Sequence, residues 1–454
     1  MTHPKRIRTH PEHHHKRKRE HKEITLRRDL GLLQATSCGV GIISGAGIYV
    51  LIGSAAGLAG NSVWLSFLIA SVVALFTAFS YAELSSIFPK DAGEYVYAEH
   101  AFGKKLAHLV GWLILSAGII SAAVVAIGFG SYFSALFGTP VLAPAIAMLA
   151  ILSYVNFIGV RQSANLNVIF TIIEVGGLIA IIVLALTSIG SVSYTEMPNG
   201  FPGVFSAAAL IFFAFIGFES VVKLSEETKN PEKVIPQALL LSIAITTILY
   251  IFVGISAVSV MGWENLAASK APLADVAASV LGTKAFLVLG IVALISTANT
   301  VLITLLSTSR IAYGMSHARS LPSVLSRIHN KHRTPWVAIL CILIISILFM
   351  LGGDLNLIAE LTNFTIFVTF ILVNLSLIVL RYKSHHYQGK FRAPLNIGRF
   401  PVTALLGIFM CLFLIMQLQR FVIEGGIILI LIGFVFYKWY EFFESVEIKV
   451  RYRK

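Results

Sequence analysis

Long apolar segments alternate with short polar connections along nearly the whole chain. A membrane-spanning helix needs about twenty consecutive apolar residues, and windows of that length predict twelve spans. They fall near 31–58, 62–87, 104–137, 141–160, 164–188, 203–223, 236–260, 284–314, 335–352, 357–380, 400–420 and 424–440. The predicted fold class is therefore an all-α polytopic membrane protein with about 12 transmembrane helices. The composition agrees, because 57% of the residues are hydrophobic and only 13% are charged, against about a quarter charged in soluble domains.

Positive charge marks one side of these spans. If the N-terminus lies inside, all but three of the 35 lysines and arginines fall on the inner side, the exceptions being Lys270, Lys284 and Arg420. Basic residues near span ends mark the cytoplasmic face. We therefore expect a multi-pass protein of the cell (cytoplasmic) membrane with both termini cytoplasmic.

The same reasoning explains the net charge of +13 and the basic, His-rich segment 1–28. We interpret this segment as a cytoplasmic tail that sets topology and contacts anionic headgroups of the lipid bilayer, so no nucleic acid is expected as a partner. A metal-binding histidine cluster is the alternative. Cys38, Cys341 and Cys411 all lie in apolar segments, which offers no metal-site spacing. No disulfide-linked accessory subunit is expected either.

A short polar interruption, Ser44-Gly45-Ala46-Gly47, lies inside the first span, where no residue is charged. Each glycine weakens a helix by roughly 1 kcal/mol relative to alanine. Backbone groups freed at membrane depth are tolerated only where they line a cavity or are buried in protein. The interruption is therefore a candidate ligand site, although a glycine pair also serves close helix packing. A second break at a related position would favour the ligand site.

The sixth span contains such a break. Its apolar run is interrupted at Gly217 and then carries an acid, Glu219. Two broken helices five spans apart are typical of a five-plus-five inverted repeat, with the binding site where the breaks face each other. We expect a first repeat over 29–188, a second over 203–381, two additional helices over 400–440 and a cytoplasmic C-terminal tail over 441–454.

Several stretches, in this order and spacing, resemble the amino acid–polyamine–organocation superfamily of secondary transporters, the amino acid permeases. They are Gly45-Ala46-Gly47-Ile48-Tyr49, Tyr81-Ala82-Glu83-Leu84, Gly93-Glu94-Tyr95-Val96-Tyr97, Phe213-Ala214-Phe215-Ile216-Gly217-Phe218-Glu219, Glu226-Glu227-Thr228-Lys229-Asn230-Pro231 and Ser309-Arg310-Ile311-Ala312-Tyr313-Gly314-Met315. The resemblance covers essentially the whole chain. It implies the inverted-repeat fold with broken helices 1 and 6, and transport of amino acids or related amines.

The resemblance also implies roles by position. The first break would bind the substrate carboxylate through backbone N–H groups, helped by the positive end of the following half-helix. The second would offer carbonyls to the substrate ammonium, with Phe213 as an aromatic gate; core packing is the alternative for each phenylalanine. The expected substrate-binding residues are Ser44, Gly45, Ala46, Gly47, Phe212, Phe213, Ala214, Phe215 and Gly217.

The positions of the ionisable residues limit which class of substrate and which coupled ion are expected. The central parts of spans one, three and eight carry no Lys, Arg, Asp or Glu, which favours a neutral, small or apolar amino acid over a cationic amino acid or polyamine. Acids within the membrane are functional candidates, and Glu174 lies about where some proton-coupled relatives have a lysine. Desolvation would favour its neutral form, so a proton is the expected coupled ion and sodium is less favoured.

The proton-coupling residues expected from this reasoning are Glu174, Glu219, Ser296 and Thr297. Glu219 lies four residues before Lys223, a spacing that suits a pair on one helix face. A purely structural role for Glu174, and exchange of one amino acid for another without proton coupling, are the alternatives. We interpret Glu83 as part of cytoplasmic-side structure and gating.

The motifs of other function classes are absent from the sequence. No Gly-rich phosphate loop, His-Glu-x-x-His motif, nucleophile elbow or cysteine cluster is present, which argues against an enzyme and against a cofactor. A channel would need uninterrupted pore helices or a repeated filter. A transporter that works by alternating access is the predicted function.

Overall fold

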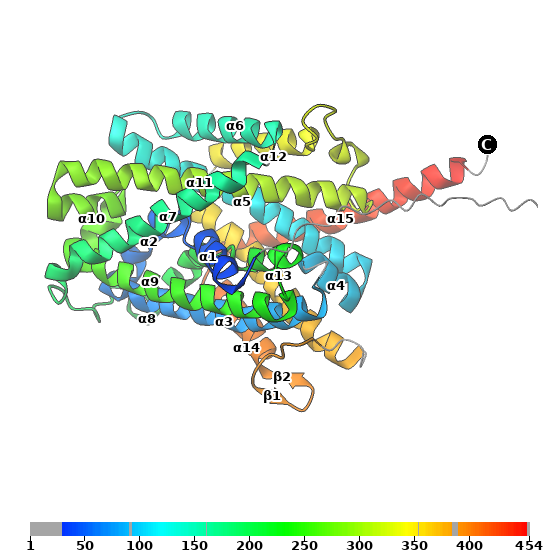
Figure 1. Cartoon of the computed structure of the whole chain (residues 1–454), viewed down its shortest axis with the longest axis horizontal. Coiled ribbons are helices and arrows are strands. Elements are labelled where there is room, and N and C mark those ends of the chain that lie inside the picture. The colour runs from blue at the N-terminus through cyan, green and yellow to red at the C-terminus, as the bar shows by residue number, and fades with distance from the viewer. Residues whose placement is uncertain (1–29, 90–92, 160, 353, 384–388, 452–454) are drawn as a thin grey trace, which may run out of the picture.

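The computed structural model describes residues 30–451 except 90–92, 160, 353 and 384–388, so the basic tail 1–28 lies outside the described residues. The helices lie side by side with their axes roughly along the longest dimension (Figure 1). They are α1 (Leu32–Ile43), α2 (Ala46–Ala59), α3 (Val63–Ile87), α4 (Glu94–Phe102), α5 (Lys104–Phe137), α6 (Leu142–Ile158), α7 (Arg161–Leu184), α8 (Gly200–Ile211), α9 (Pro231–Ala268), α10 (Pro272–Leu281), α11 (Thr283–His317), α12 (Trp336–Leu351), α13 (Leu355–Lys383), α14 (Val402–Ile415) and α15 (Arg420–Arg451).

Short 3₁₀ segments and one hairpin complete the fold. The 3₁₀ segments are η1 (Gly60–Ser62), η2 (Ala185–Ser188), η3 (Phe212–Phe215), η4 (Phe218–Glu227) and η5 (Ser323–Ser326), and the strands are β1 (Asn396–Ile397) and β2 (Phe400–Pro401). The two strands pair antiparallel, with Asn396 opposite Pro401. The predicted C-terminal tail begins within α15, which continues as a helix to Arg451, and its cytoplasmic location stays a prediction.

Each of the twelve ranges predicted from hydropathy contains helix in the structure. Eight helical segments of the described chain are long and apolar enough to cross a membrane, while α1, α6, α10, α12 and α14 are shorter apolar helices of 10–17 residues. The chain is therefore a multi-pass helical membrane protein, and the number of twelve crossings stays a prediction.

The first predicted break lies where the sequence indicated. α1 ends at Ile43 and α2 begins at Ala46, so only Ser44 and Gly45 separate the two helices. Gly45 has an extended backbone with ψ near −152°, which turns the chain between the helices. The first predicted span is thus two half-helices joined by a non-helical step.

The second break is also confirmed, and it is longer. α8 ends at Ile211, and the chain continues through η3 to Gly217 before η4 begins. Gly217 has φ 118°, in the left-handed region, and a Cβ there would lie 2.9 Å from Cγ2 of Ile42. Glycine alone adopts this backbone conformation without strain, which explains why the interruption is centred on this residue.

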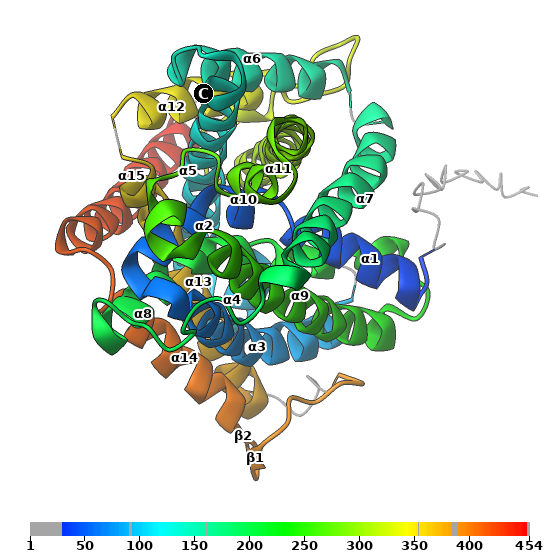
Figure 2. The same ribbon diagram turned by 90° about the vertical axis from the view of Figure 1, so that its left-hand side faces the viewer.

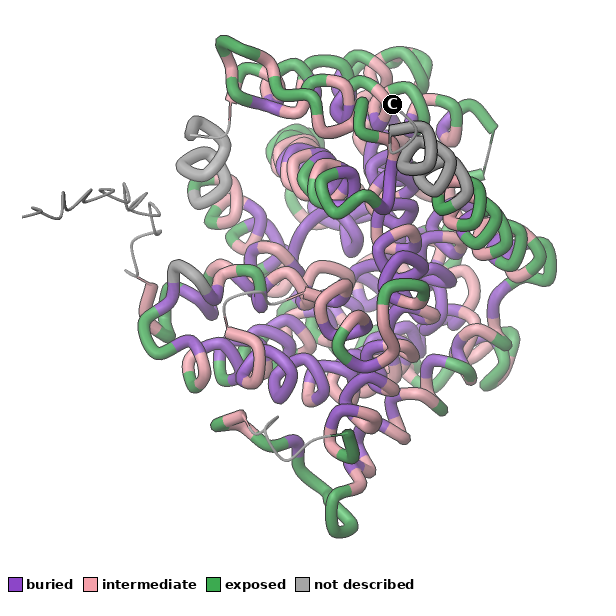
Figure 3. The backbone as a smooth tube through the Cα atoms, turned by 90° about the vertical axis from the view of Figure 1, so that its right-hand side faces the viewer, coloured by how far each residue is buried: buried purple, intermediate pink, exposed green. Residues whose placement is uncertain are grey.

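Corresponding helices of the two predicted repeats pack on each other. α3 packs along α9, and α5 packs along α11, while the inverted relation of the two repeats stays a prediction. Seen along the helices, α2, α5 and α11 occupy the middle and α6, α12 and α15 lie at the periphery (Figure 2). Buried residues concentrate on the inner helices, whereas the peripheral helices are largely exposed (Figure 3).

The exposed periphery is apolar. Ile151 and Tyr154 of α6, Leu348 of α12 and Phe421 and Val435 of α15 are all more than half exposed. In water such a surface would drive association, but in a bilayer it is the surface that contacts lipid. The polar residues are therefore interior, where they can define a site.

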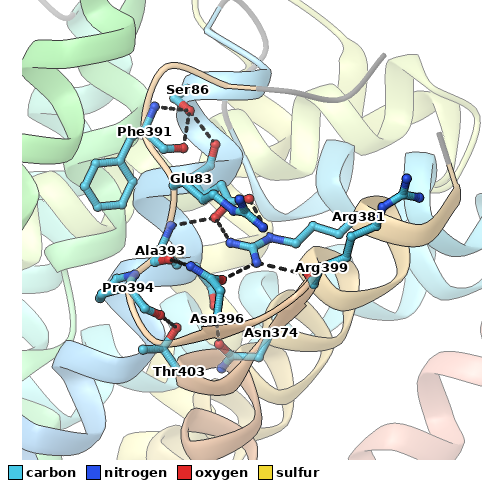
Figure 4. A network of polar contacts seen from close by, with 12 residues as sticks. Glu83, Ser86, Asn374, Arg381, Phe391, Ala393, Pro394, Asn396, Arg399 and Thr403 are labelled. Atoms are coloured by element: carbon cyan, nitrogen blue, oxygen red, sulfur yellow. Dashed lines mark hydrogen bonds and ion pairs between the residues drawn. The ribbon is translucent and has the colours of Figure 1, made fainter. Parts of the chain in front are cut away.

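A buried ion pair fixes the β1–β2 hairpin segment to the membrane helices. Arg381 of α13 donates from Nε to Glu83 of α3 at 2.7 Å and also binds the second carboxylate oxygen through Nη2, and the backbone N–H of Ala393 donates to Glu83 at 2.7 Å. Arg381 further bonds Asn396 of β1 (Figure 4). Glu83 therefore has the structural role predicted for it, and its role in gating stays a prediction.

Candidate functional site

The two breaks meet at an internal cavity of about 120 Å³. Each break contributes backbone to its wall, with α5, α11 and α13 supplying side chains. The predicted site residues on this wall are Gly45, Ala46, Gly47, Phe213, Ala214, Gly217 and Glu219. A space of this size suits a small ligand rather than one of drug size.

The glycines of the first break allow three segments to approach one another. A Cβ on Gly47 would lie 2.5 Å from the Cα of Ala214 in the second break, and a Cβ on Gly45 would lie 2.4 Å from Oγ1 of Thr300. Both separations are far below van der Waals contact. The close packing of the glycines is thus what brings the two breaks and α11 around the cavity.

Backbone donors gather at the first break. The first four N–H groups of a helix have no intrahelical acceptor, and in α2 these include the N–H groups of Ala46 and Gly47. The N–H of Ala46 donates to Oγ1 of Thr300 at 3.0 Å, and that hydroxyl donates in turn to the carbonyl of Ser296 at 3.0 Å. The positive end of α2 therefore faces the cavity, and Thr300 holds it against α11.

The carbonyls freed by the breaks have partners on other helices. The Tyr250 hydroxyl of α9, which is fully buried, lies 2.7 Å from the carbonyl of Ile43 and 2.9 Å from the carbonyl of Ala214, as a donor to both. Asn363 of α13 donates to the carbonyls of Ala209 and Leu210 at 2.7 and 2.9 Å. Tyr250 thus joins the two breaks, and Asn363 caps the end of α8.

The phenylalanines of the second break point in different directions. Phe213 lines the cavity and is 5% exposed. Phe212 packs on Phe367 of α13 with ring centroids 4.7 Å apart, and Phe215 packs on Tyr250 at 5.2 Å. The structure therefore brings Phe213 to the cavity and places Phe212 and Phe215 against neighbouring helices.

Ser44 of the first break is buried, and its hydroxyl has no hydrogen-bond partner among the described residues.

Glu174 is fully buried and connects to the cavity through one side chain. Asn299 of α11, which lines the cavity, donates from Nδ2 to Oε1 of Glu174 at 3.0 Å. The Tyr49 hydroxyl of α2 donates to the backbone carbonyl of Glu174 at 2.7 Å. α7 is therefore tied to the half-helix that follows the first break and to the cavity wall.

Three polar atoms near the ends of this network lack partners among the described residues: Oε2 of Glu174 and the hydroxyls of Ser44 and Ser296. The Thr297 hydroxyl, by contrast, donates to the carbonyl of Ala293 at 2.8 Å within α11. Buried polar atoms of this kind are costly unless a ligand, water or proton satisfies them. These three atoms are therefore ones that a bound water or ligand could satisfy.

Glu219 lies at one side of the cavity with Lys223. Its Oε2 accepts the backbone N–H of Gly217 at 2.9 Å, so the acid stabilises the left-handed turn of the second break. Glu219 and Lys223 both line the cavity. They lie in the 3₁₀ segment η4, in which residues three apart share a face, so the pairing predicted from the four-residue spacing stays a prediction.

Sequence reasoning missed Tyr250, Asn299 and Asn363. Each is a polar side chain inside an apolar helix, and its hydroxyl or amide must find a partner there. That signal was available from the sequence, although most of the partners are backbone atoms at distant breaks and only the structure identifies them. Thr300 was a candidate partner of Glu174 from the sequence, and the structure shows that it binds the first break instead.

Comparison with known proteins agrees with this geometry. The sequence profile described as amino acid permease matches residues 30–437. The branched-chain amino acid permease BcaP of Bacillus subtilis is 32% identical over 92% of this chain and 94% of its own length. The serine/threonine exchanger SteT of Bacillus subtilis is 27% identical over 85% of this chain and 91% of its own. Mouse cationic amino acid transporter 4 is 31% identical over 80% of this chain and 61% of its own.

Proposed function

The chain belongs to the amino acid permease family and is a transporter rather than an enzyme, and on this premise we propose that it takes up neutral, small or apolar amino acids by alternating access. In this proposal it resides in the cell membrane with both termini in the cytoplasm, and uptake is coupled to protons. The basic inner loops support that orientation.

The observation that carries the proposal is the opposite polarity of the two breaks across one small cavity. Gly45, Ala46 and Gly47 of the first break and Phe213 and Ala214 of η3 line this cavity. The N–H of Ala46 and the carbonyl of Ala214 already bond to Thr300 and Tyr250, so in this proposal other freed N–H and C=O groups of the two breaks bind the substrate. A zwitterion needs a donor cluster for its carboxylate and an acceptor cluster for its ammonium. Because both clusters are backbone, they recognise what all amino acids share.

The rest of the wall supports a neutral side chain. α5 contributes Ile114, Ala117 and Gly118, and α11 contributes Ile303, which are aliphatic or small. BcaP and SteT, as named, act on branched-chain amino acids and on serine or threonine, all of them neutral. A cationic amino acid or polyamine is the second candidate substrate, favoured by the similarity to cationic amino acid transporter 4.

Proton coupling is supported by Glu174. Its carboxyl is fully buried, accepts one hydrogen bond from Asn299 and has a second oxygen without a partner among the described residues. Gain or loss of a proton at this carboxyl would change how it binds Asn299 on the cavity wall. Amino acid exchange without protons is the second candidate mechanism, since SteT is named an exchanger.

Uptake into proteoliposomes tests the proposal. The full-length protein is reconstituted, and labelled leucine, alanine, serine and arginine are offered with and without an inside-alkaline pH gradient. We expect uptake of the neutral amino acids to rise with the gradient and to collapse when a protonophore is added. Uptake that needs an internal amino acid and ignores the gradient would establish exchange instead. No movement of any amino acid or amine would refute the transport function.

A further inference from the structure

A second cavity of about 370 Å³ adjoins the central one, between α4, α5 and α11. Lys223 of η4 lines both cavities, and it is exposed. Lys223 therefore stands on the path between the central cavity and solvent. Among the described residues it is the one cation on either wall.

The described wall of the central cavity has one acid and one base. Glu219 and Lys223 are the ionisable side chains among its described lining residues, and when both are ionised they carry one charge of each sign. Oε2 of Glu219 accepts a hydrogen bond from the N–H of Gly217 at 2.9 Å, which holds this carboxylate at the second break. Glu94, which also lies within electrostatic range of Glu219, faces the second cavity, where it accepts a hydrogen bond from the Tyr81 hydroxyl at 3.1 Å.

This balance constrains the substrate. A zwitterion with a neutral side chain adds no net charge to the cavity. A cationic side chain would add one positive charge that Glu219, already compensated by Lys223, does not neutralise. An uncompensated charge is disfavoured where the effective dielectric is lower than in bulk water, and like charges placed together suppress the wrong ligand.

We propose that Lys223 is the residue that confines this cavity to substrates of zero net charge and excludes cationic amino acids. The inference rests on the proposed function and adds the determinant of substrate charge. It predicts that removing Lys223 leaves Glu219 as a free countercharge and admits a cationic substrate. Removing the charge of Glu219 instead leaves Lys223 uncompensated and admits an anionic one.

Binding to the purified full-length protein tests the inference, with L-leucine, L-arginine and L-aspartate as probes in calorimetry. The wild type is expected to prefer leucine over arginine by at least about tenfold. Lys223→Met should raise arginine affinity relative to leucine by roughly 10- to 100-fold, as expected for loss of one repulsive charge at short range. Glu219→Gln keeps an acceptor for Gly217 and should raise relative aspartate affinity by a similar factor.

The double variant and a surface control complete the design. Lys223→Met combined with Glu219→Gln restores a balanced cavity and should return the preference to leucine. Lys233→Met removes an exposed lysine that lies on neither cavity wall, and it should leave all three affinities unchanged.

Two results would overturn the inference: wild-type protein that binds arginine as tightly as leucine, or an arginine-to-leucine ratio that Lys223→Met does not change. If Lys223→Met fails to fold, the aspartate affinity of Glu219→Gln decides by itself, and an unchanged value refutes the balance of charges. Wild-type protein that binds no amino acid at all refutes the proposed function itself, which distinguishes the two failures.

Discussion

Gly47→Ala is the sharpest test of the idea that the two breaks form one site. The added Cβ would lie 2.5 Å from the Cα of Ala214 and 3.0 Å from its N and Cβ. Carbon atoms in contact are about 3.5–4.0 Å apart, so the breaks must separate by about 1 Å. The obstructing atoms belong to backbone and to a Cβ, hence no side-chain rotation relieves the clash.

The expected magnitude follows from this geometry. Inserting a methyl group into a well-packed interior costs roughly 1–3 kcal/mol. If the separation of the breaks weakens substrate binding by that amount, affinity falls by about 5- to 150-fold. Calorimetric titration with leucine measures the loss, and the melting temperature without ligand shows whether the variant remains folded.

Gly176→Ala is the matched control. Gly176 also lies in a membrane helix, but a Cβ added there would meet no heavy atom within 4 Å. Alanine favours a helix by about 1 kcal/mol over glycine, so this variant should bind leucine normally and melt at the same or a slightly higher temperature. If Gly47→Ala behaves like Gly176→Ala, with unchanged affinity, Gly47 serves helix propensity or packing alone and the reasoning is wrong.

Three further variants test other contacts. Tyr250→Phe removes the donor shared by the two breaks; we expect leucine affinity to fall about tenfold, from loss of about 1–2 kcal/mol, and an unchanged affinity would exclude a positioning role. Glu174→Gln should abolish the pH dependence of leucine uptake, and retained pH dependence would contradict proton coupling at Glu174. The control is Glu360→Gln, which changes another buried acid and should preserve the pH dependence. Glu83→Gln should lower the free energy of unfolding by about 3–5 kcal/mol, because it leaves Arg381 buried without its partner; an unaltered denaturation midpoint would contradict this.

The positions of the breaks could be predicted because glycine acts locally. Gly45 and Gly47 weaken the first helix, and Gly217 supports a backbone angle of 118° that other residues avoid. Membrane depth then limits the outcome, since freed backbone groups must be satisfied by protein or by a ligand. The sequence alone therefore located both breaks, and the inverted repeat that relates them stays a prediction.

The direction of each phenylalanine could not be predicted, because it depends on the helix type. In a 3₁₀ segment, residues three apart lie on the same face, so Phe212 and Phe215 of η3 share a face while Phe213 takes another. The structure turns the shared face toward α13 and α9. A run of apolar residues does not distinguish this geometry from an α-helix, so only the resemblance to the permeases, and not the apolar pattern, singled out Phe213 as the gate.

Hydrogen-bond and ion-pair partners that are far apart in the sequence could not be predicted either. Tyr250 lies 207 residues from Ile43, and Arg381 lies 298 residues from Glu83. Such pairs depend on how the helices rotate and slide against one another, which hydropathy does not encode. The sequence could flag a buried tyrosine or arginine as needing a partner, but only the packed helices show which backbone or carboxylate satisfies it.

Close helix packing and ligand binding are two alternative explanations for a glycine in a membrane helix. At Gly47 the two are connected, because the close packing brings together the residues of the proposed binding site. Gly47 has no side chain because Ala214 of the opposite break occupies that space. This contact holds the two breaks side by side at the cavity, where the proposed zwitterion would bind between N–H groups of one break and carbonyls of the other. A larger residue at position 47 would therefore remove the site by separating its two halves, even though it would leave every donor and acceptor in the chain.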